Sequence, residues 1–189
     1  MLQALRLKVI KALIDLNERI FFERRLARSY KSLNGQSFKN VLDVGANKGQ
    51  TISFFLKMNR QCKISSFEPN KSLFKKLNQK YGALPNVRIY NLGISDGTGE
   101  KLFQENVLDY TSTFEELNPN SKYLKNKSSI LGVSPDAIVK DKYIVSTTTL
   151  AAFINEHVNE TIDVLKIDIE GHEFAALKGL FAEPTKHAI

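Results

Sequence analysis

Acidic side chains stand at the ends of three successive apolar runs in the first half of the sequence. Asp43 lies within VLDV, Glu68 follows ISSF, and Asp96 follows NLGIS. A carboxylate accepts hydrogen bonds from hydroxyl, amino and ammonium groups. Each of these acids alone would more often be a helix cap or a turn residue. At the carboxyl ends of three predicted strands they indicate one ligand-binding edge, because ligands of open α/β sheets bind there.

The segment VLDVGANKGQ (Val41–Gln50) predicts a sharp turn from a buried strand into a helix. Gly45 and Gly49 allow that turn, which presents backbone N–H groups and the positive end of the helix to a ligand. A dinucleotide site would need a further glycine where Asn47 stands, because the pyrophosphate approaches the backbone closely there. The segment therefore suits a cofactor without phosphates, such as S-adenosylmethionine, with its amino group on Asp43. A tight turn without a ligand is the alternative.

The run KIDIEGHE places ionisable residues at the mouth of a predicted helix. His172 is the first candidate for a general base, because an unperturbed imidazole titrates near neutral pH. Asp168 and Glu170 are the next candidates, and they could instead hold a divalent cation through their oxygen atoms, although no specific metal motif is present. His172 could also serve only as a helix cap or as a partner of Glu170. Lys166 alternates out of the strand and is expected to pair with an acid.

Short apolar runs alternate with helical patterns after Lys39, which predicts strand–helix–strand units and a parallel sheet. The predicted strands are Val41–Val44, Lys63–Phe67, Val87–Leu92 and Val164–Ile167. The predicted helices are Gln50–Met58, Ser72–Tyr81, Leu150–Val158 and Glu173–Phe181. Two further strands, Lys101–Gln104 and Tyr143–Thr148, are expected to pair. Residues 105–141 form a long connection, which we interpret as a lid over the acceptor with 110–113 as its ordered part; a flexible insertion is the alternative.

Four sequence blocks together resemble the FkbM family of S-adenosylmethionine-dependent methyltransferases. They are DVGANKG, FEP, SDGTG and KIDIEGHEFAALKG, in this order between Val41 and Gly179. The resemblance implies an α/β protein with the Rossmann-like class I methyltransferase fold, whose mostly parallel sheet carries helices on both faces. It also implies O-methylation, with a sugar, glycan or natural-product hydroxyl as the small-molecule acceptor.

The resemblance also implies a role for each matching residue. Glu68 would hold the ribose of the cofactor, and Ser95 and Asp96 would hold its adenine. The methionine end would be lined by Asp43, Gly45, Asn47 and Gly49. Residues Asp168 to Glu173 would lie at the transfer site.

The family pattern stops early in this sequence. Only ten residues follow Gly179, so the last strands of the fold are not expected, and Val164–Ile167 becomes a sheet edge that can pair with another chain. Weak or absent activity of the 189-residue chain is the corresponding prediction. A truncated, non-catalytic Rossmann-like module that binds cofactor or another protein is the alternative function.

The net charge of +7 raises the question of a nucleic-acid or membrane partner. Residues 1–31 hold eight basic and three acidic residues, together with apolar residues spaced three and four apart, which is typical of an amphipathic helix. We therefore divide the chain into a basic helix with its connector (1–38) and a methyltransferase-like domain (39–189). The helix can pack on its own domain, contact an anionic membrane peripherally or face a protein partner. No nucleic-acid partner is expected, because no recognised motif is present.

The single cysteine, Cys62, excludes an internal disulfide framework and fits a reducing compartment, so a cytoplasmic protein is expected. One cysteine and three scattered histidines cannot form a zinc-type cluster. Charged residues interrupt the N-terminal apolar stretch, so no signal peptide is expected. No run approaches the ~20 apolar residues that span a bilayer.

Overall fold

The computed structural model describes residues 9, 10, 12, 38–107, 112–118 and 120–187. It divides the chain into two compact units. The sheet unit comprises Phe38–Glu115 and Asp141–Ile189, and the second unit comprises Met1–Ser37 and Glu116–Lys140. The predicted basic helix and its connector lie outside the described residues, apart from three helical positions near residue 10 and Phe38. Their docking on the domain, a membrane or a partner stays a prediction.

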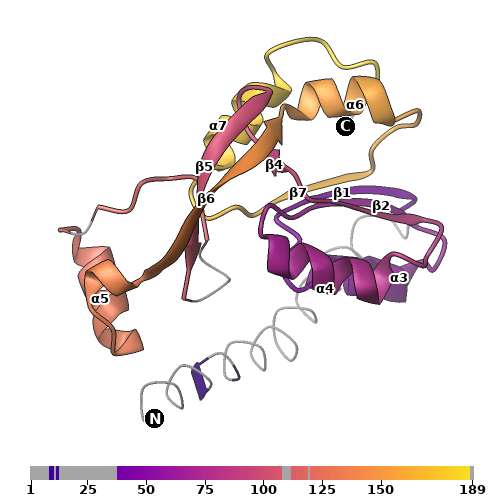
Figure 1. Ribbon diagram of the computed structural model, residues 1–189. Helices are drawn as coiled ribbons and strands as arrows, with labels where there is room; N and C mark the ends of the chain where they lie inside the picture. Colours follow the sequence, from indigo (N-terminus) through magenta and orange to yellow (C-terminus); the bar gives the residue numbers. More distant parts are fainter. Residues whose placement is uncertain (1–8, 11, 13–37, 108–111, 119, 188–189) are drawn as a thin grey trace. The chain divides into compact units, whose positions relative to one another are not determined.

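Four parallel strands form the main sheet of the sheet unit (Figure 1). They are β1 (Asn40–Val44), β2 (Lys63–Phe67), β3 (Val87–Tyr90) and β7 (Val164–Ile167), in the order β3-β2-β1-β7. All five residues of β1 are buried, as expected for a central parallel strand covered on both faces. The register pairs Val41 with Ile64 of β2 and with Val164 of β7. The four predicted parallel strands are confirmed, with β3 two residues shorter than expected.

Helices cover both faces of this sheet, α3 (Gln50–Met58) and α4 (Lys71–Tyr81) on one and α6 (Leu150–His157) and α7 (Glu173–Leu180) on the other (Figure 1). On the α6–α7 face, the core joins residues of the sheet to residues of the helices; it includes Leu42, Val44, Phe67, Phe153, Ile154 and Ala176. This arrangement confirms the predicted α/β class. Among the described helices, none is both long and apolar enough to cross a membrane.

A second sheet contains β4 (Gly93–Ile94), β6 (Val139–Thr148) and β5 (Gly99–Asn106), in that order. The predicted pairing of the two later strands is confirmed. The prediction that Asp96 follows the third parallel strand is wrong, because β3 ends at Tyr90 and Asp96 follows the short β4. The side chain of Asn91 accounts for the early end of β3, since its Nδ2 donates to the backbone oxygens of Glu68 and Pro69 at 2.9 and 3.0 Å. The side-chain amide of Asn91 thus takes the place of the next backbone hydrogen bond between β2 and β3.

The long connection contains regular structure. Within the second unit, α5 (Lys122–Leu131) begins after Ser121, whose hydroxyl accepts from Leu124 N at 3.1 Å, and ends at Gly132 with a left-handed φ of 70°. A short 3₁₀ helix, η3 (Pro135–Ala137), follows. Of the predicted ordered part, residues 110 and 111 lie outside the described residues, while Ser112 and Thr113 are hydrogen-bonded to the end of β5. The role as an acceptor lid stays a prediction.

The strand order creates a switch point at β1. The chain runs from β1 to β2 and β3 on one side, whereas β7 pairs with the other side of β1. In open α/β sheets the crevice at such a point, beyond the carboxyl ends of the strands, is where ligands bind. A ligand site is therefore expected at the carboxyl ends of β1 and β7.

The switch point has no room for a side chain at position 45. Gly45 has a φ of 86°, and a Cβ there would lie 2.0 Å from the backbone oxygen of Asp168. We expect Gly45→Ala to lower the free energy of unfolding by about 2 kcal/mol or more, because left-handed strain adds to displacement of the chain beyond β7. Urea denaturation followed by circular dichroism measures this change.

The matched control is Gly97→Ala, because a Cβ on Gly97 meets no atom within 4 Å. This variant should stay within about 0.5 kcal/mol of the unsubstituted chain. Equal losses for the two variants would contradict the packing argument.

Candidate functional site

The turn between β1 and α3 is fastened to the neighbouring strand. The N–H groups of Gly45 and Ala46 both donate to the backbone oxygen of Phe67 at 3.0 Å. Asn47 adopts a left-handed backbone with a φ of 50°. Gly49, with a φ of 81°, packs so tightly against α4 that a Cβ would not fit. The structure therefore places Gly45 and Asn47 at the carboxyl edge of the sheet and Gly49 against α4.

The carboxylate of Glu68 joins two turns at the end of β2. Glu68 is 5% exposed, its Oε2 accepts from Asn47 N at 2.7 Å, and its Oε1 accepts from Asn70 N at 2.9 Å. Burial raises the pKa of Glu68 to about 7, although these two hydrogen bonds oppose the rise. Glu68 is therefore only partly ionised near neutral pH.

Lys166 brings an ammonium group to the buried carboxylate of Asp43. Its Nζ lies 3.3 Å from Asp43 Oδ1 and donates to Gly45 O at 2.7 Å, so the predicted pairing of Lys166 with an acid is confirmed. Despite this ion-pair distance, Asp43 Oδ1 accepts no hydrogen bond within the described part of the chain. The buried Oδ1 of Asn47 accepts none there either. Both oxygen atoms can receive donors from a bound ligand.

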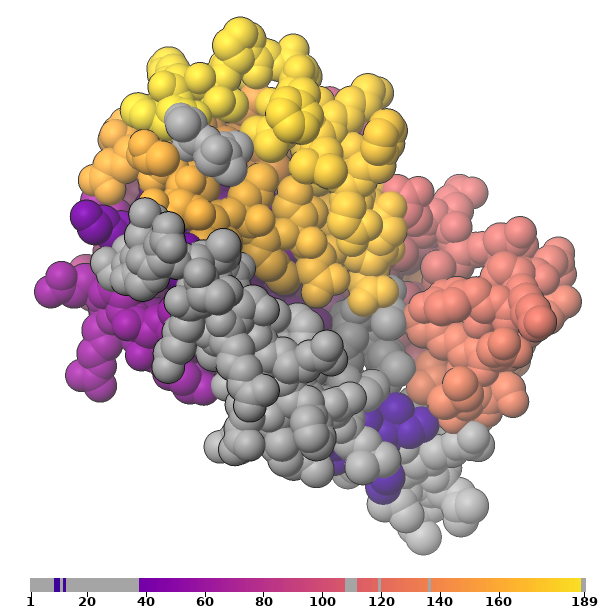
Figure 2. Space-filling model, turned by 180° about the vertical axis from the view of Figure 1, so that it is seen from behind, coloured from indigo at the N-terminus to yellow at the C-terminus, as the bar shows by residue number. Residues whose placement is uncertain are grey.

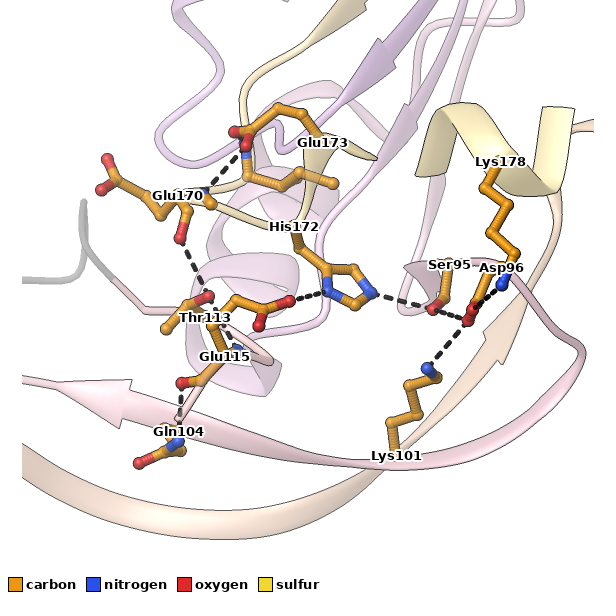
Figure 3. Close-up of polar contacts among 12 residues, drawn as sticks. Ser95, Asp96, Lys101, Gln104, Thr113, Glu115, Glu170, His172, Glu173 and Lys178 are labelled. Atoms are coloured by element: carbon orange, nitrogen blue, oxygen red, sulfur yellow. Dashed lines mark hydrogen bonds and ion pairs between the residues drawn. The ribbon is translucent and has the colours of Figure 1, made fainter. Parts of the chain in front are cut away.

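A chain of hydrogen bonds runs through the imidazole of His172 (Figure 3). His172 is 5% exposed, its Nδ1 lies 2.6 Å from Glu115 Oε1, and its Nε2 lies 2.8 Å from Ser95 Oγ. His172 occupies the N-cap position of α7 but makes no capping hydrogen bond, so the helix-cap alternative is wrong. Because both ring nitrogens are engaged, direct removal of an acceptor proton by His172 requires one of these contacts to break.

Two lysines hold Asp96 beside this chain. Nζ of Lys101 donates to Asp96 Oδ1 at 2.9 Å, and Nζ of Lys178 donates to Oδ2 at 3.3 Å. Hydrogen bonds from Lys101, Lys178 and Ser95 hold the pKa of Asp96 well below its usual range. The structure therefore brings Ser95, Asp96 and His172 together, with cations on the carboxylate that was predicted to hold adenine.

The carboxylate of Glu173 organises the segment after β7. Its Oε1 accepts from Ile169 N at 2.9 Å, and its Oε2 accepts from Gly171 N at 3.0 Å. Burial raises the pKa of Glu173, but the backbone hydrogen bonds outweigh this effect and leave the pKa below its usual value. Glu173 therefore stays ionised and holds the loop through these two hydrogen bonds.

Asp168 and Glu170 extend from this loop with exposed side chains. The Asp168 side chain is 71% exposed and lies 3.9 Å from Lys166 Nζ. Glu170 has a left-handed φ of 55°, and its backbone oxygen accepts from Thr113 Oγ1 at 3.0 Å. The described residues contain no group of three His, Cys, Asp or Glu side chains that could hold a metal ion.

Sequence reasoning did not single out Glu115, which is the partner of His172. The Glu115 side chain is 51% exposed, and its backbone is held by Gln104 Nε2 at 2.7 Å and by Thr113 Oγ1 at 3.0 Å (Figure 3). Glu115 lies 57 residues before His172. No local spacing relates two residues so far apart, so the sequence carried no signal for this contact.

A cleft of about 840 Å³ lies at the far ends of α3 and α4, and its lining includes Leu56, Arg60, Lys80 and Leu84. Both helices begin at the carboxyl edge of the sheet and run away from it, so the cleft lies on the opposite side. None of the predicted site residues lines it. The polar groups at the carboxyl edge, rather than this cleft, therefore define the candidate site.

The fold and its polar edge define a doubly wound α/β protein with a candidate ligand site at the switch point of its sheet. The family model described as "Methyltransferase FkbM domain" matches residues 43–186, which include every residue of the candidate site. The chain therefore belongs to the FkbM methyltransferase family, as its four sequence blocks predicted.

Two curated relatives match the chain at low identity. The AMB antimetabolite synthetase AmbE of Pseudomonas aeruginosa is 27% identical over 159 residues, which cover 74% of this chain and 8% of AmbE. The 2-O-methyltransferase NoeI of Sinorhizobium fredii is 26% identical over 140 residues, which cover 74% of this chain and 56% of NoeI. The chain thus spans about half the length of NoeI and a small part of AmbE. The crystal structure of methyltransferase FkbM from Methylobacillus flagellatus aligns with a TM-score of 0.43 at 14% identity, over 76% of this chain and 29% of that one.

Glu68 should make the stability of the protein depend on pH. Its pKa of about 7 in the folded protein lies above the value of about 4.3 for an unfolded glutamate. Between these values the folded state binds more protons than the unfolded state, so the free energy of unfolding falls as the pH rises from about 4 to 7. Glu68→Gln removes this titration. The melting temperature of Glu68→Gln relative to that of the unsubstituted chain should therefore rise by several degrees between pH 5 and 8, measured by circular dichroism.

Glu183→Gln is the matched control, because Glu183 is exposed. Its melting temperature relative to the unsubstituted chain should not change over this pH range. A difference for Glu68→Gln that is constant with pH would show that Glu68 ionises normally in the folded protein.

Removal of the His172 ring should destabilise the sheet unit. His172→Ala leaves the buried Ser95 hydroxyl without its ring partner and opens a cavity beside Phe114, whose ring centroid lies 5.1 Å from that of His172. We expect a loss of about 2 kcal/mol or more in urea denaturation. His157→Ala is the control, since the His157 side chain is 40% exposed. Equal losses would mean that the His172 hydrogen bonds contribute nothing specific to stability.

Proposed function

We propose that the chain forms the cofactor-binding part of an S-adenosylmethionine-dependent O-methyltransferase that acts on a hydroxyl of a sugar, glycan or natural product. The main supporting observation is the buried carboxylate of Glu68, bonded to the glycine turn at the switch point. Membership of the FkbM family supports methyl transfer. The name of NoeI, a 2-O-methyltransferase, supports a hydroxyl acceptor.

The groups at the carboxyl edge fit S-adenosylmethionine by chemical type. The Glu68 carboxylate can accept from the ribose hydroxyls, and the unsatisfied oxygen atoms of Asp43 and Asn47 can accept from the ammonium group. Lys166 supplies a cation for the carboxylate of the ligand. Ser95 and Asp96 can hold adenine, because Asp96 Oδ2 accepts only from Lys178 among the described residues and keeps capacity for a further donor. Gly45 places no side chain in the turn, whereas Gly49 lets the turn pack closely against α4.

When bound, S-adenosylmethionine supplies an electrophilic methyl group on a sulfonium. The contribution of the chain is to orient the acceptor, which can lower the barrier by about 7–11 kcal/mol, and to accept its proton. Asp168, Glu170 and His172 are the proposed proton acceptors. Asp168 and Glu170 are exposed, whereas His172 must first release Ser95 or Glu115. Asp168 and Glu170 have no third metal-binding side chain beside them among the described residues, so we give a divalent cation no role.

A non-catalytic binding or interaction module is the second candidate function. Within the described residues, β7 is the outer strand of the main sheet, and such an edge can pair with another chain. Beside it, α7 and the residue that follows it expose Phe174 (80%), Leu177 (39%) and Phe181 (79%). Figure 2 shows the C-terminal residues (yellow) as a continuous surface beside α6 (orange). An open edge next to apolar side chains favours contact with a second copy of the chain or with another polypeptide.

Calorimetric titration of the 189-residue chain with S-adenosylmethionine and S-adenosylhomocysteine tests the proposal. We expect both to bind, and Glu68→Gln to weaken S-adenosylhomocysteine binding about tenfold or more, because an amide offers fewer acceptors to the ribose hydroxyls. Affinity should also rise between pH 6 and 8 as Glu68 loses its proton near pH 7. Glu183→Gln should bind like the unsubstituted chain.

Two further outcomes would contradict the proposal or its assignment of Glu68. A folded chain that binds neither ligand would contradict the cofactor role and favour the interaction module. Undiminished binding by Glu68→Gln would remove Glu68 from the cofactor site.

A further inference from the structure

Tyr143 brings β6 to the beginning of α4. The Tyr143 hydroxyl donates to Glu105 Oε2 at 3.3 Å, and Lys71 Nζ lies 5.2 Å from the centroid of the ring. Lys71 is the first residue of α4. On the second sheet, the ring of Phe103 supports Tyr143, with their centroids 5.7 Å apart. The second sheet therefore reaches the turn that follows Glu68.

This turn contacts both Glu68 and Tyr143. Asn70 N donates to Glu68 Oε1 at 2.9 Å, and the side chain of the next residue, Lys71, lies over the Tyr143 ring. Burial raises the pKa of Tyr143, the charge of Glu105 raises it further, and Glu68 adds a smaller effect. The phenol therefore stays protonated at neutral pH and lies within electrostatic range of Glu68.

The surroundings of Tyr143 suit a ligand that combines hydroxyl donors with a flat ring. The Glu68 carboxylate has acceptor capacity beyond the two N–H groups that it already binds. Lys71, which lies over the Tyr143 ring, is exposed. A cation–π contact at an exposed position is weak, so a ligand ring can replace the ammonium group. Hydroxyl donors next to an aromatic ring are the features of a nucleoside.

We propose that Tyr143 forms a wall of the nucleoside-binding part of the site, with its ring against the adenosine of the cofactor and Glu68 on the ribose side. This inference rests on the proposed function and adds a residue from β6 to the cofactor site. Glu105 is a positioning residue, because it acts on the ligand only through the Tyr143 hydroxyl.

Titration with two ligands tests this assignment. S-Adenosylhomocysteine carries both the nucleoside and the amino-acid end, whereas 5′-methylthioadenosine lacks the amino-acid end. Tyr143→Ala should weaken the binding of both by the same factor, about tenfold, which is the order of a ring–base stacking contact. Tyr143→Phe keeps the ring and should stay within about threefold of the unsubstituted chain. Tyr123→Ala is the control, because Tyr123 is 62% exposed and belongs to the second unit.

A second measurement does not depend on the folding of the alanine variant. In a chain whose tyrosine rings alone carry aromatic protons, bound S-adenosylhomocysteine should show a nuclear Overhauser effect between ribose H1′ or adenine protons and a tyrosine ring. This effect should vanish in Tyr143→Phe, whose phenylalanine rings are deuterated.

The outcomes separate this inference from the proposed function. Loss of binding in Glu68→Gln, with undiminished binding in folded Tyr143→Ala and no Overhauser effect, would overturn the inference alone. A loss confined to S-adenosylhomocysteine would overturn the nucleoside assignment, and equal losses in the Phe and Ala variants would overturn the ring contact. Absence of S-adenosylhomocysteine binding by the unsubstituted chain would overturn both proposals.

Discussion

The buried carboxylate of Glu68 ties together the parts of the sheet unit that the candidate site requires. It accepts one N–H from the glycine turn after β1, at Asn47, and one from the start of α4, at Asn70. A carboxylate withdrawn from water is costly unless hydrogen bonds replace the lost hydration. The pKa of about 7 indicates that two N–H donors replace it only in part. A ligand that brings further donors would complete this compensation, which gives the site a physical reason to bind one.

The polar groups of the carboxyl edge form two networks, and in the second a hydroxyl proton can change its acceptor. In the first, the buried carboxylate of Asp43 pairs with the partly exposed Lys166 beside the glycine turn. In the second, the hydroxyl of Ser95 has one proton, which it can donate either to Nε2 of His172 or to Asp96. One rotation of this hydroxyl therefore exchanges one partner for the other.

The second sheet adds a set of packed aromatic rings beside the candidate site. A row of aromatic rings runs along it, from Tyr143 to Phe103 (5.7 Å) and from Phe103 to Phe114 (5.1 Å), and reaches His172 at 5.1 Å from Phe114. Such rings keep few rotamers when packed, so the row connects the turn after Glu68 to the His172 network through a stiff surface. The site is consequently built from both sheets of the sheet unit.

The sequence alone determined the elements of the main sheet and the chemistry at its edge. The bounds of α3, β2 and β7 agree with the prediction to the residue, because local hydrophobic periods and turn residues decide them. The glycine turn could also be predicted from the sequence, because Gly45 and Gly49 mark a sharp turn. The structure gives the reason at Gly45, where the backbone of Asp168 leaves no room for a side chain. Tertiary structure decided the rest. Asn91 ended β3 early and displaced Asp96 from the predicted strand end. Glu115 and Ser95 meet His172 across 57 and 77 residues of chain, separations that no local pattern can relate. The raised pKa of Glu68 likewise depends on burial, which neighbours from distant segments provide.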